Sequence, residues 1–267
     1  MRVETLLDLS PRKIIEIIRR YVYPTELQRV AKMNRYTPAM VKFLDKKIHI
    51  VDSVSYIAMI DEIFIKRNYE FKSPKESPKI IDVGANIGLS IIFFKQLYPK
   101  SIITAFEADP IIFRALEKNI AFFNFEDVVL YERAAWKENT TLEFFSEGGL
   151  CGRIKKGLDD KSLIKVQTVR LRDFLNEEID FLKLDVEGAE TEILKDCADV
   201  IGNVKNIFVE YHHYYSEPQT LHDILKILAE NGFDYHIKES VVAKHPFIER
   251  PKLAGMDFQV NIFAFKN

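Results

Sequence analysis

The stretch that decides the fold is residues 80–90, which read IIDVGANIGLS. An apolar run leads to Asp82, two glycines at 84 and 88 bound a turn, and a helix-like pattern follows. A strand that passes through a glycine turn into a helix is typical of the start of a βαβ unit. In an open α/β sheet this turn lies at the carboxyl edge, where ligands bind. We therefore expect this turn to face a ligand.

The chain after residue 76 alternates between strand and helix patterns. The expected strands are 79–84, 102–107, 128–133, 181–185, 206–212, 233–238 and 261–267, and the expected helices are about 88–97, 110–120, 187–196 and 218–230. Residues 141–169 are expected to insert a hairpin around a glycine-rich turn. The alternation predicts a parallel sheet covered by helices on both faces. The last two strands have no helix between them, which predicts that an antiparallel strand closes the sheet.

The region before the α/β pattern is expected to form a separate part of the protein with a different secondary structure. We expect an amino-terminal, mainly helical extension or cap at 1–75 and the α/β domain at 76–267, joined by the polar, proline-containing stretch KSPKESPK at 72–79. Within the extension, the expected elements are a helix at 11–23, one or two helices within 25–45, a short strand at 47–52 and a helix from Ser53, as its cap, to about Lys66.

Composition excludes several classes of protein. The formal charge of −2 on 267 residues gives no sign of a nucleic-acid partner. Two cysteines, Cys151 and Cys197, are too few for a disulfide scaffold, and their spacing fits no zinc site. No apolar run reaches the roughly 18–20 residues of a membrane helix, since VSYIAMIDEIFI at 54–65 is interrupted by two acids. We expect a cytoplasmic protein without a transmembrane segment.

The glycine spacing argues against a phosphate-bearing ligand. The turn has Gly-x-x-x-Gly, whereas a dinucleotide fingerprint requires Gly-x-Gly-x-x-Gly. Asn86 and Leu89 stand where its second and third glycines would be, and the pattern of a phosphate loop also fails. A nicotinamide-dependent oxidoreductase is therefore an alternative that the spacing disfavours.

Two acids suggest a different ligand. Asp82 would repel a phosphate but suits a cationic amino acid. Glu107 ends the second strand of the pattern, where an acid can accept hydrogen bonds from a ribose diol. S-adenosylmethionine satisfies both requirements, because it joins an adenosine to a cationic amino acid without phosphates.

Three stretches carry a resemblance to a known family: IIDVGANIG at 80–88, AFEADP at 105–110 and FLKLDVEGAE at 181–190, with FVEYH at 208–212 as a looser fourth. Over about 47–267 the chain resembles the FkbM family of class I, Rossmann-like methyltransferases. The resemblance implies a seven-stranded, mostly parallel sheet of order 3-2-1-4-5-7-6 with the last strand antiparallel. It also implies O-methylation, by S-adenosylmethionine, of a hydroxyl on a sugar, glycan or polyketide-like small molecule.

The resemblance also implies the contacts of the methyl donor. The residues expected around the methionine portion are Asp82, Gly84, Asn86 and Gly88. Glu107 is expected to hold the ribose hydroxyls, and the residues expected beside the adenine are Ala108 on one side and Ala134 and Ala135 on the other. Asn86 is expected to hold the methionine end or to pin the loop itself.

A second group of polar residues ends the fourth and fifth strands of the pattern. His212 is the first candidate for a catalytic base that activates a hydroxyl, with Glu210 and Asp185 next. Lys183 interrupts a strand expected to be buried, so we expect it to pair with Asp185 or Glu210. The carboxylates of Asp185, Glu187 and Glu210 could also bind Mg²⁺, although we assign no metal ligands.

Two further questions stay open at the level of sequence. A non-catalytic module that only binds S-adenosylmethionine is a further alternative to an enzyme. The amino-terminal extension is expected either to cover the acceptor site or to form the surface of a homodimer.

Overall fold

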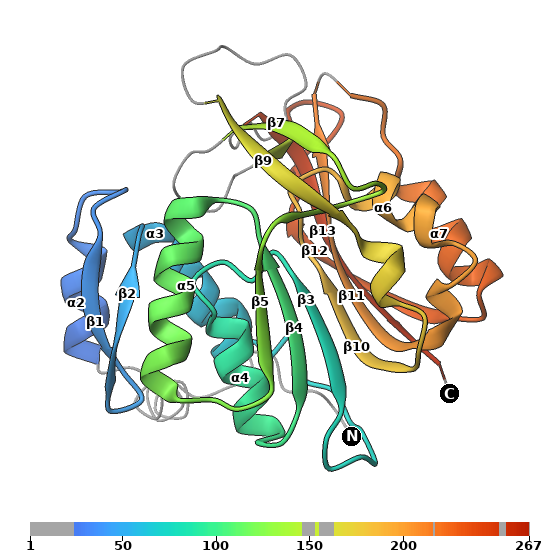
Figure 1. Cartoon of the computed structure of the whole chain (residues 1–267). Coiled ribbons are helices and arrows are strands. Elements are labelled where there is room, and N and C mark those ends of the chain that lie inside the picture. The colour runs from blue at the N-terminus through green and yellow to red at the C-terminus, as the bar shows by residue number, and fades with distance from the viewer. Residues whose placement is uncertain (1–23, 146–152, 155–162, 216, 251–254, 267) are drawn as a thin grey trace, which may run out of the picture.

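A seven-stranded sheet forms the centre of the protein in the computed structural model (Figure 1). The structure describes residues 24–145, 153–154, 163–215, 217–250 and 255–266. The sheet strands are β3 (Lys79–Val83), β4 (Ile102–Glu107), β5 (Val128–Glu132), β10 (Ile179–Leu184), β11 (Val204–Tyr214), β12 (Asp234–Val241) and β13 (Met256–Phe265).

The strand order confirms the predicted fold. The order is β12-β13-β11-β10-β3-β4-β5, which is 3-2-1-4-5-7-6 when the strands of this sheet alone are counted along the chain. Strands β3, β4, β5, β10 and β11 run parallel, and β13 is antiparallel to both of its neighbours. The chain differs in detail from a plain alternation because it adds a second sheet between β5 and β10.

Helices cover both faces of the central sheet, as Figure 1 shows. The helices are α4 (Leu89–Leu97) and α5 (Pro110–Phe123) on one face and α6 (Glu190–Cys197) and α7 (Leu221–Glu230) on the other. Each pair packs into its own apolar cluster, with Phe94 and Leu116 in one and Ile193 and Leu228 in the other. Every residue of β10 is buried, because this strand lies in the middle of a sheet covered on both sides.

The inserted hairpin is present among the described residues, whereas residues 148–152 of the glycine-rich turn expected within it lie outside them. Strand β7 (Thr141–Phe145) pairs antiparallel with β9 (Leu163–Arg170), and β8 (Arg153–Ile154) pairs with β7. Strand β6 (Ala134–Trp136) runs parallel to β9, which extends the insertion into a four-stranded sheet.

The described part of the amino-terminal region combines helices with a hairpin. It contains α2 (Pro24–Ala31), the antiparallel hairpin of β1 (Ala39–Phe43) and β2 (Lys46–Ile50), α3 (Ser53–Met59) and a π-helical segment, η1 (Ile60–Ile65). Of the one or two helices expected within 25–45, α2 is present, whereas Ala39–Phe43 forms a strand that was not expected. This segment buries alternate residues, Val41 and Phe43, and therefore forms a strand. The helix expected at 11–23 lies outside the described residues.

Asp52, rather than Ser53, caps α3. The Asp52 carboxylate accepts a hydrogen bond from the backbone N–H of Ser55 and lies 3.0 Å from the guanidinium of Arg35. The helix predicted through Lys66 is present as α3 followed by η1.

One buried side chain of α5, Asn119, forms hydrogen bonds that help to attach the hairpin of β1 and β2 to the α/β domain. Its amide oxygen accepts from His49 N at 2.7 Å, and its amide nitrogen donates to His49 O and to Ile87 O at 2.9 Å each. Because Ile87 belongs to the first βα turn, this side chain joins the amino-terminal region to the edge where a ligand is expected. None of the described helices is long and apolar enough to cross a membrane.

Candidate active site

The first βα turn contains a glycine that no other residue could replace without a clash. Gly84 has φ +83, and a Cβ at this position would lie 2.0 Å from the backbone oxygen of Asp185. The turn therefore packs directly against the end of β10. Gly88 has φ +88, and a Cβ there would lie 2.7 Å from Leu116 of α5. Both glycines serve close packing, which explains their spacing without reference to a phosphate.

Asn86 pins the turn. It adopts φ 48, a left-handed conformation that asparagine tolerates better than most residues. Its side-chain oxygen accepts from Ile87 N at 2.8 Å, and its backbone N–H donates to Glu107 Oε2 at 3.0 Å. Of the two roles expected for this side chain, the structure shows the one within the loop; contact with a ligand stays a prediction.

Glu107 lies where the second strand ends and connects two loops. Its Oε1 accepts from Asp109 N at 2.9 Å, while Oε2 accepts from Asn86 N. Burial raises the pKa of Glu107 to about 7. A carboxylate has about four acceptor positions, so these two bonds leave capacity for the two hydroxyls of a ribose.

The alanines expected around an adenine fall into two groups. Ala108 packs beside the small cluster of Ala134 and Val166. Ala135 points to the other side of β6, into the apolar core that contains Trp136. Ala108 and Ala134 are thus together, whereas Ala135 supports the site from the core, and its contact with an adenine stays a prediction.

Lys183 is buried and paired, as expected from its place in a central strand. Its Nζ lies 3.2 Å from Asp185 Oδ2 and donates to Gly84 O at 2.7 Å. It also lies 3.5 Å from Asp82 Oδ1, a partner that the sequence did not indicate. Burial lowers the pKa of Lys183, but the charges of Asp185 and Asp82 outweigh it and raise the pKa above its usual value. Of the two predicted partners, Asp185 rather than Glu210 forms the ion pair.

Asp82 lies beneath the turn rather than at its surface. It has no exposed surface, and Ser90 Oγ donates to its Oδ2. Burial raises the pKa of Asp82, although Lys183 opposes this shift. Its expected contact with the donor stays a prediction, and the structure shows a role in holding Lys183 below Gly84.

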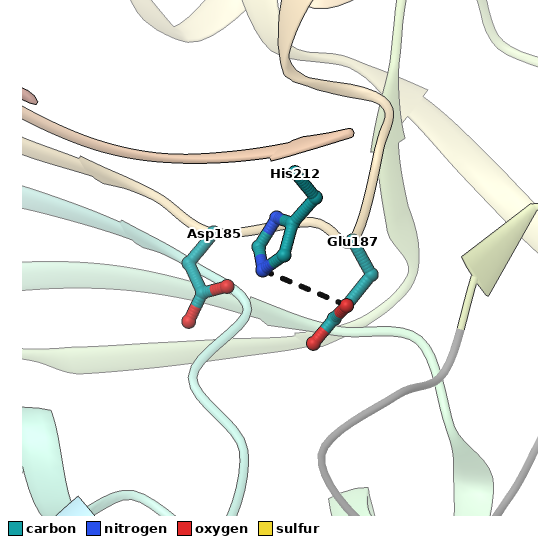
Figure 2. Close-up of side chains that lie close together, drawn as sticks. All are labelled: Asp185, Glu187 and His212. Atoms are coloured by element: carbon teal, nitrogen blue, oxygen red, sulfur yellow. Dashed lines mark ion pairs between the residues drawn. The ribbon is translucent and has the colours of Figure 1, made fainter. Parts of the chain in front are cut away.

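His212 is held in a fixed orientation at the end of β11 (Figure 2). Its Nδ1 lies 2.8 Å from Glu190 Oε1, and its Nε2 lies 3.6 Å from Glu187 Oε2. Glu190 also accepts from Gly188 N, which fixes the carboxylate, and Tyr214 OH donates to Glu187 Oε2 at 2.9 Å. The ring therefore has one nitrogen bound and directs the other toward Asp185 and Glu187.

The charges around His212 determine its protonation. Burial lowers the pKa of His212, but Glu187 and Glu190 outweigh burial and raise the pKa well above its usual value. Burial also raises the pKa of Glu187 to about 7. Glu187 has φ 54, uncommon for a residue other than glycine, and such strained positions cluster at functional sites.

Two further acids, Glu210 and Glu62, lie close enough to Asp185 for the charges to affect one another. Glu210 of β11 is 7% exposed, and burial together with the charges of Glu62 and Asp185 raises its pKa well above the usual value. Glu62 comes from η1 in the amino-terminal region, and burial raises its pKa to about 7. In the sequence this acid interrupts the apolar run at 54–65, and that interruption was the only signal of a role for Glu62.

The structure thus brings the predicted polar residues to one edge of the sheet. His212, Asp185 and Glu210 lie near one another, and Glu107 lies across the first turn. Glu190 was missed as a partner of His212 because an acid at a helix amino terminus is explained by the helix dipole alone. Tyr214 was missed as well.

The glycine turn after the first strand and the acid after the second both lie at the carboxyl edge of the sheet, where open α/β sheets bind their ligands. The family profile described as "Methyltransferase FkbM domain" matches residues 82–235, more than half of the chain. The chain belongs to the FkbM methyltransferase domain family.

Three curated proteins illustrate the similarity. The chain is 28% identical over 175 residues to "Methyltransferase 1" of Beauveria bassiana, covering 56% of this chain and 70% of that protein. It is 27% identical over 236 residues to "Methyltransferase sdnD" of Sordaria araneosa, covering 74% and 90%. It is 28% identical over 158 residues to "2-O-methyltransferase NoeI" of Sinorhizobium fredii, covering 51% and 64%.

Membership of this family makes the protein an enzyme that transfers methyl groups from S-adenosylmethionine. It also decides against the nicotinamide-dependent oxidoreductase and the purely non-catalytic module. The residues present fit the donor, since Glu107 at the carboxyl edge of the sheet lies beside the first turn and retains acceptor capacity for a diol.

Proposed function

We propose that the protein methylates a hydroxyl oxygen of a sugar, a glycan or a polyketide-like small molecule. The observation that carries this proposal is the pair of His212 and Glu190, in which a buried carboxylate fixes one nitrogen of the imidazole and directs the other into the site. A hydroxyl is a weak nucleophile, and a base within hydrogen-bond reach accelerates its reaction. The name "2-O-methyltransferase NoeI" of one relative supports oxygen as the acceptor atom.

The proposed donor contacts are those expected from the sequence. When bound, S-adenosylmethionine supplies a methyl group activated by a positively charged sulfur. Glu107 would accept hydrogen bonds from the ribose hydroxyls, and Ala108 with Ala134 would border the adenine. The turn of Gly84 to Gly88 would surround the methionine portion, with Asn86 holding its shape.

His212 would act as the base in its neutral form. Glu190 accepts the Nδ1 hydrogen and thereby keeps the Nε2 lone pair directed into the site. The proton that leaves the acceptor hydroxyl moves to Nε2, and the charges of Glu187 and Glu190 stabilise the resulting imidazolium. Asp185 is engaged by Lys183 and would orient the acceptor rather than take its proton.

The proposal is tested by methyl transfer from donor labelled in its methyl group. We expect label to enter ether linkages of hydroxylated acceptors, drawn from a panel of mono- and oligosaccharides and hydroxylated polyketides, with S-adenosylhomocysteine formed in equal amount. Nuclear magnetic resonance of the product identifies the atom that carries the label. Label on nitrogen or carbon would contradict the choice of oxygen.

A specific observation supports a second candidate, a metal-assisted reaction. One ligand atom each from Asp185, Glu187 and His212 lie within 4.8 Å of one another, a set that differs from the expected Asp185, Glu187 and Glu210 (Figure 2). Mixed carboxylate and imidazole ligands suit divalent cations such as Mn²⁺ or Zn²⁺. However, Asp185 is already ion-paired with Lys183, and Glu187 already accepts a hydrogen bond from Tyr214. Both carboxylates therefore have a partner without a metal ion.

Removal of divalent metal separates the two candidates. With His212 as the base, we expect the rate of methyl transfer to stay within about twofold after dialysis against a chelator. A loss of activity that Mn²⁺ or Mg²⁺ restores would replace the base mechanism with the metal-assisted one.

A further inference from the structure

A row of three hydrogen-bond acceptors lies behind the site and has no role in the mechanism above. Glu210 of β11 and Asn261 of β13 are opposite each other in the antiparallel pair, and Glu62 of η1 faces them from the amino-terminal region. Glu210 and Asn261 are 7% and 6% exposed, respectively. We refer to Glu62, Glu210 and Asn261 as the acceptor triad.

Asn261 directs an unsatisfied acceptor into this region. Its Nδ2 lies 3.5 Å from Glu62 Oε1, which fixes the amide orientation because the opposite one would place oxygen against a carboxylate. Its Oδ1 is then buried without a hydrogen-bond partner among the described residues. A buried acceptor left without a donor costs free energy, so such a group indicates a missing partner.

The nearby cation does not supply that partner. Lys183 influences the pKa of Glu62, but its ammonium group is engaged by Asp185, Asp82 and Gly84 O. Two carboxylates and one amide oxygen are thus gathered where a group with several N–H donors and a positive charge is required. A primary ammonium group has three N–H donors, one for each residue of the acceptor triad, and its positive charge is opposite to that of the two carboxylates.

The acceptor triad lies close to the proposed donor site. Glu210 is two residues before His212 on β11 and so lies on the same face of the strand, and Lys183, whose charge acts on Glu62, donates to Gly84 O in the first turn. The methionine portion of the donor is proposed to lie against that turn. Asp82 has no exposed surface and is already paired, whereas Glu62 retains part of its exposed surface.

We propose that Glu62, Glu210 and Asn261 form a subsite for the α-ammonium group of the amino-acid end of the methyl donor. The inference rests on the proposed donor site, and it makes the amino-terminal region part of that site. The π-helical segment is consistent with this role, because such segments occur frequently at functional sites.

Two ligands separate this subsite from the rest of the donor site. S-adenosylhomocysteine has the α-ammonium group, whereas 5′-methylthioadenosine has the adenosine and sulfur without the amino acid. Calorimetric titration of the full chain should show that Glu62→Gln weakens S-adenosylhomocysteine about 10- to 100-fold, the size of a charge-assisted hydrogen bond, while changing methylthioadenosine less than about twofold. Asn261→Leu, which keeps volume and removes the acceptor, should weaken S-adenosylhomocysteine about threefold to tenfold.

The matched control is Asp61→Asn, which removes a charge of the same sign from the same segment. Asp61 is half-exposed and pairs with Lys66 at 2.7 Å, so this variant should bind both ligands like the unaltered protein. Unchanged S-adenosylhomocysteine binding in Glu62→Gln and Asn261→Leu would overturn the subsite, as would an equal loss for both ligands. If the unaltered protein fails to bind S-adenosylhomocysteine, the proposed donor site itself is wrong.

Discussion

Gly84→Ala is expected to abolish donor binding. The new Cβ would lie 2.0 Å from the backbone oxygen of Asp185, and φ +83 is itself unfavourable for alanine. The clash involves two backbone segments that cannot rotate away, so the first turn must move from the end of β10. Because Lys183 bonds to Gly84 O, that movement would also disturb the ion pair with Asp185. We expect a loss of more than about 100-fold in affinity for S-adenosylhomocysteine, equivalent to about 3 kcal/mol.

Gly232→Ala provides the control for Gly84→Ala. Gly232 has φ +76, but a Cβ there would have no atom within 4 Å, so the substitution adds backbone strain without a clash. It should lower stability by about 1 kcal/mol, a shift in Tm of about 2–4 °C, and leave affinity unchanged. The two variants are compared by calorimetry and thermal melting. Equal effects of both variants on affinity would contradict the role given to the close packing at Gly84.

The polar residues at the carboxyl edge of the sheet could be predicted from the sequence, because the carboxyl ends of parallel strands lie at the same edge. Asp82, Glu107, Asp185 and His212 each follow or end an apolar run, and a parallel sheet brings the ends of such runs together. The antiparallel strand β13 followed from two strand patterns without a helix between them. These inferences depend on local pattern and on general rules of topology, both of which a sequence contains.

Other features depended on contacts between distant segments. Asp82 and Lys183 are opposite each other in the pairing of β3 with β10, and their ion pair follows from that register. Glu62 reaches the site only because η1 packs against α4 and the sheet. Glu190 turns its carboxylate back toward His212 instead of serving only the helix dipole. A sequence indicates that such residues are polar but not which partner each one meets.

The first strand of the amino-terminal hairpin was missed for a local reason. The segment Ala39–Phe43 has only five residues, and its alternation of Val41 and Phe43 is too short to distinguish from a helical pattern. Leu44 and Asp45 have φ 48 and φ 60, a turn that permits β1 to return onto β2. Neither residue is a glycine, so the sequence has no strong turn signal at this position.

Removal of the base should have the largest effect on the chemical step. His212→Asn keeps an amide N–H that can donate to Glu190 but removes the nitrogen that would accept a proton. Loss of a general base typically lowers the rate by 10² to 10⁴-fold, and we expect kcat to fall by about that amount while donor affinity stays within about threefold. Single-turnover kinetics and calorimetry measure the two quantities separately. A kcat within about fivefold of the unaltered enzyme would show that another group accepts the proton.

Glu190→Gln tests the same assignment through pH. The base must be neutral, and the pKa of His212 is raised well above its usual value, so the rate should increase as pH rises through that pKa. Glu190 is one of the charges that raise this pKa; its removal should therefore shift the ascending limb of the pH–rate profile to lower pH. The maximal rate should also fall roughly tenfold, because the ring loses its fixed orientation. Glu192→Gln, on the same helix and paired with Lys137 at the surface, should leave the limb in place. If the limb of Glu190→Gln also stays in place, the ionisation that controls the rate does not belong to His212, and a role for Glu187 or a bound metal would have to be considered in its place.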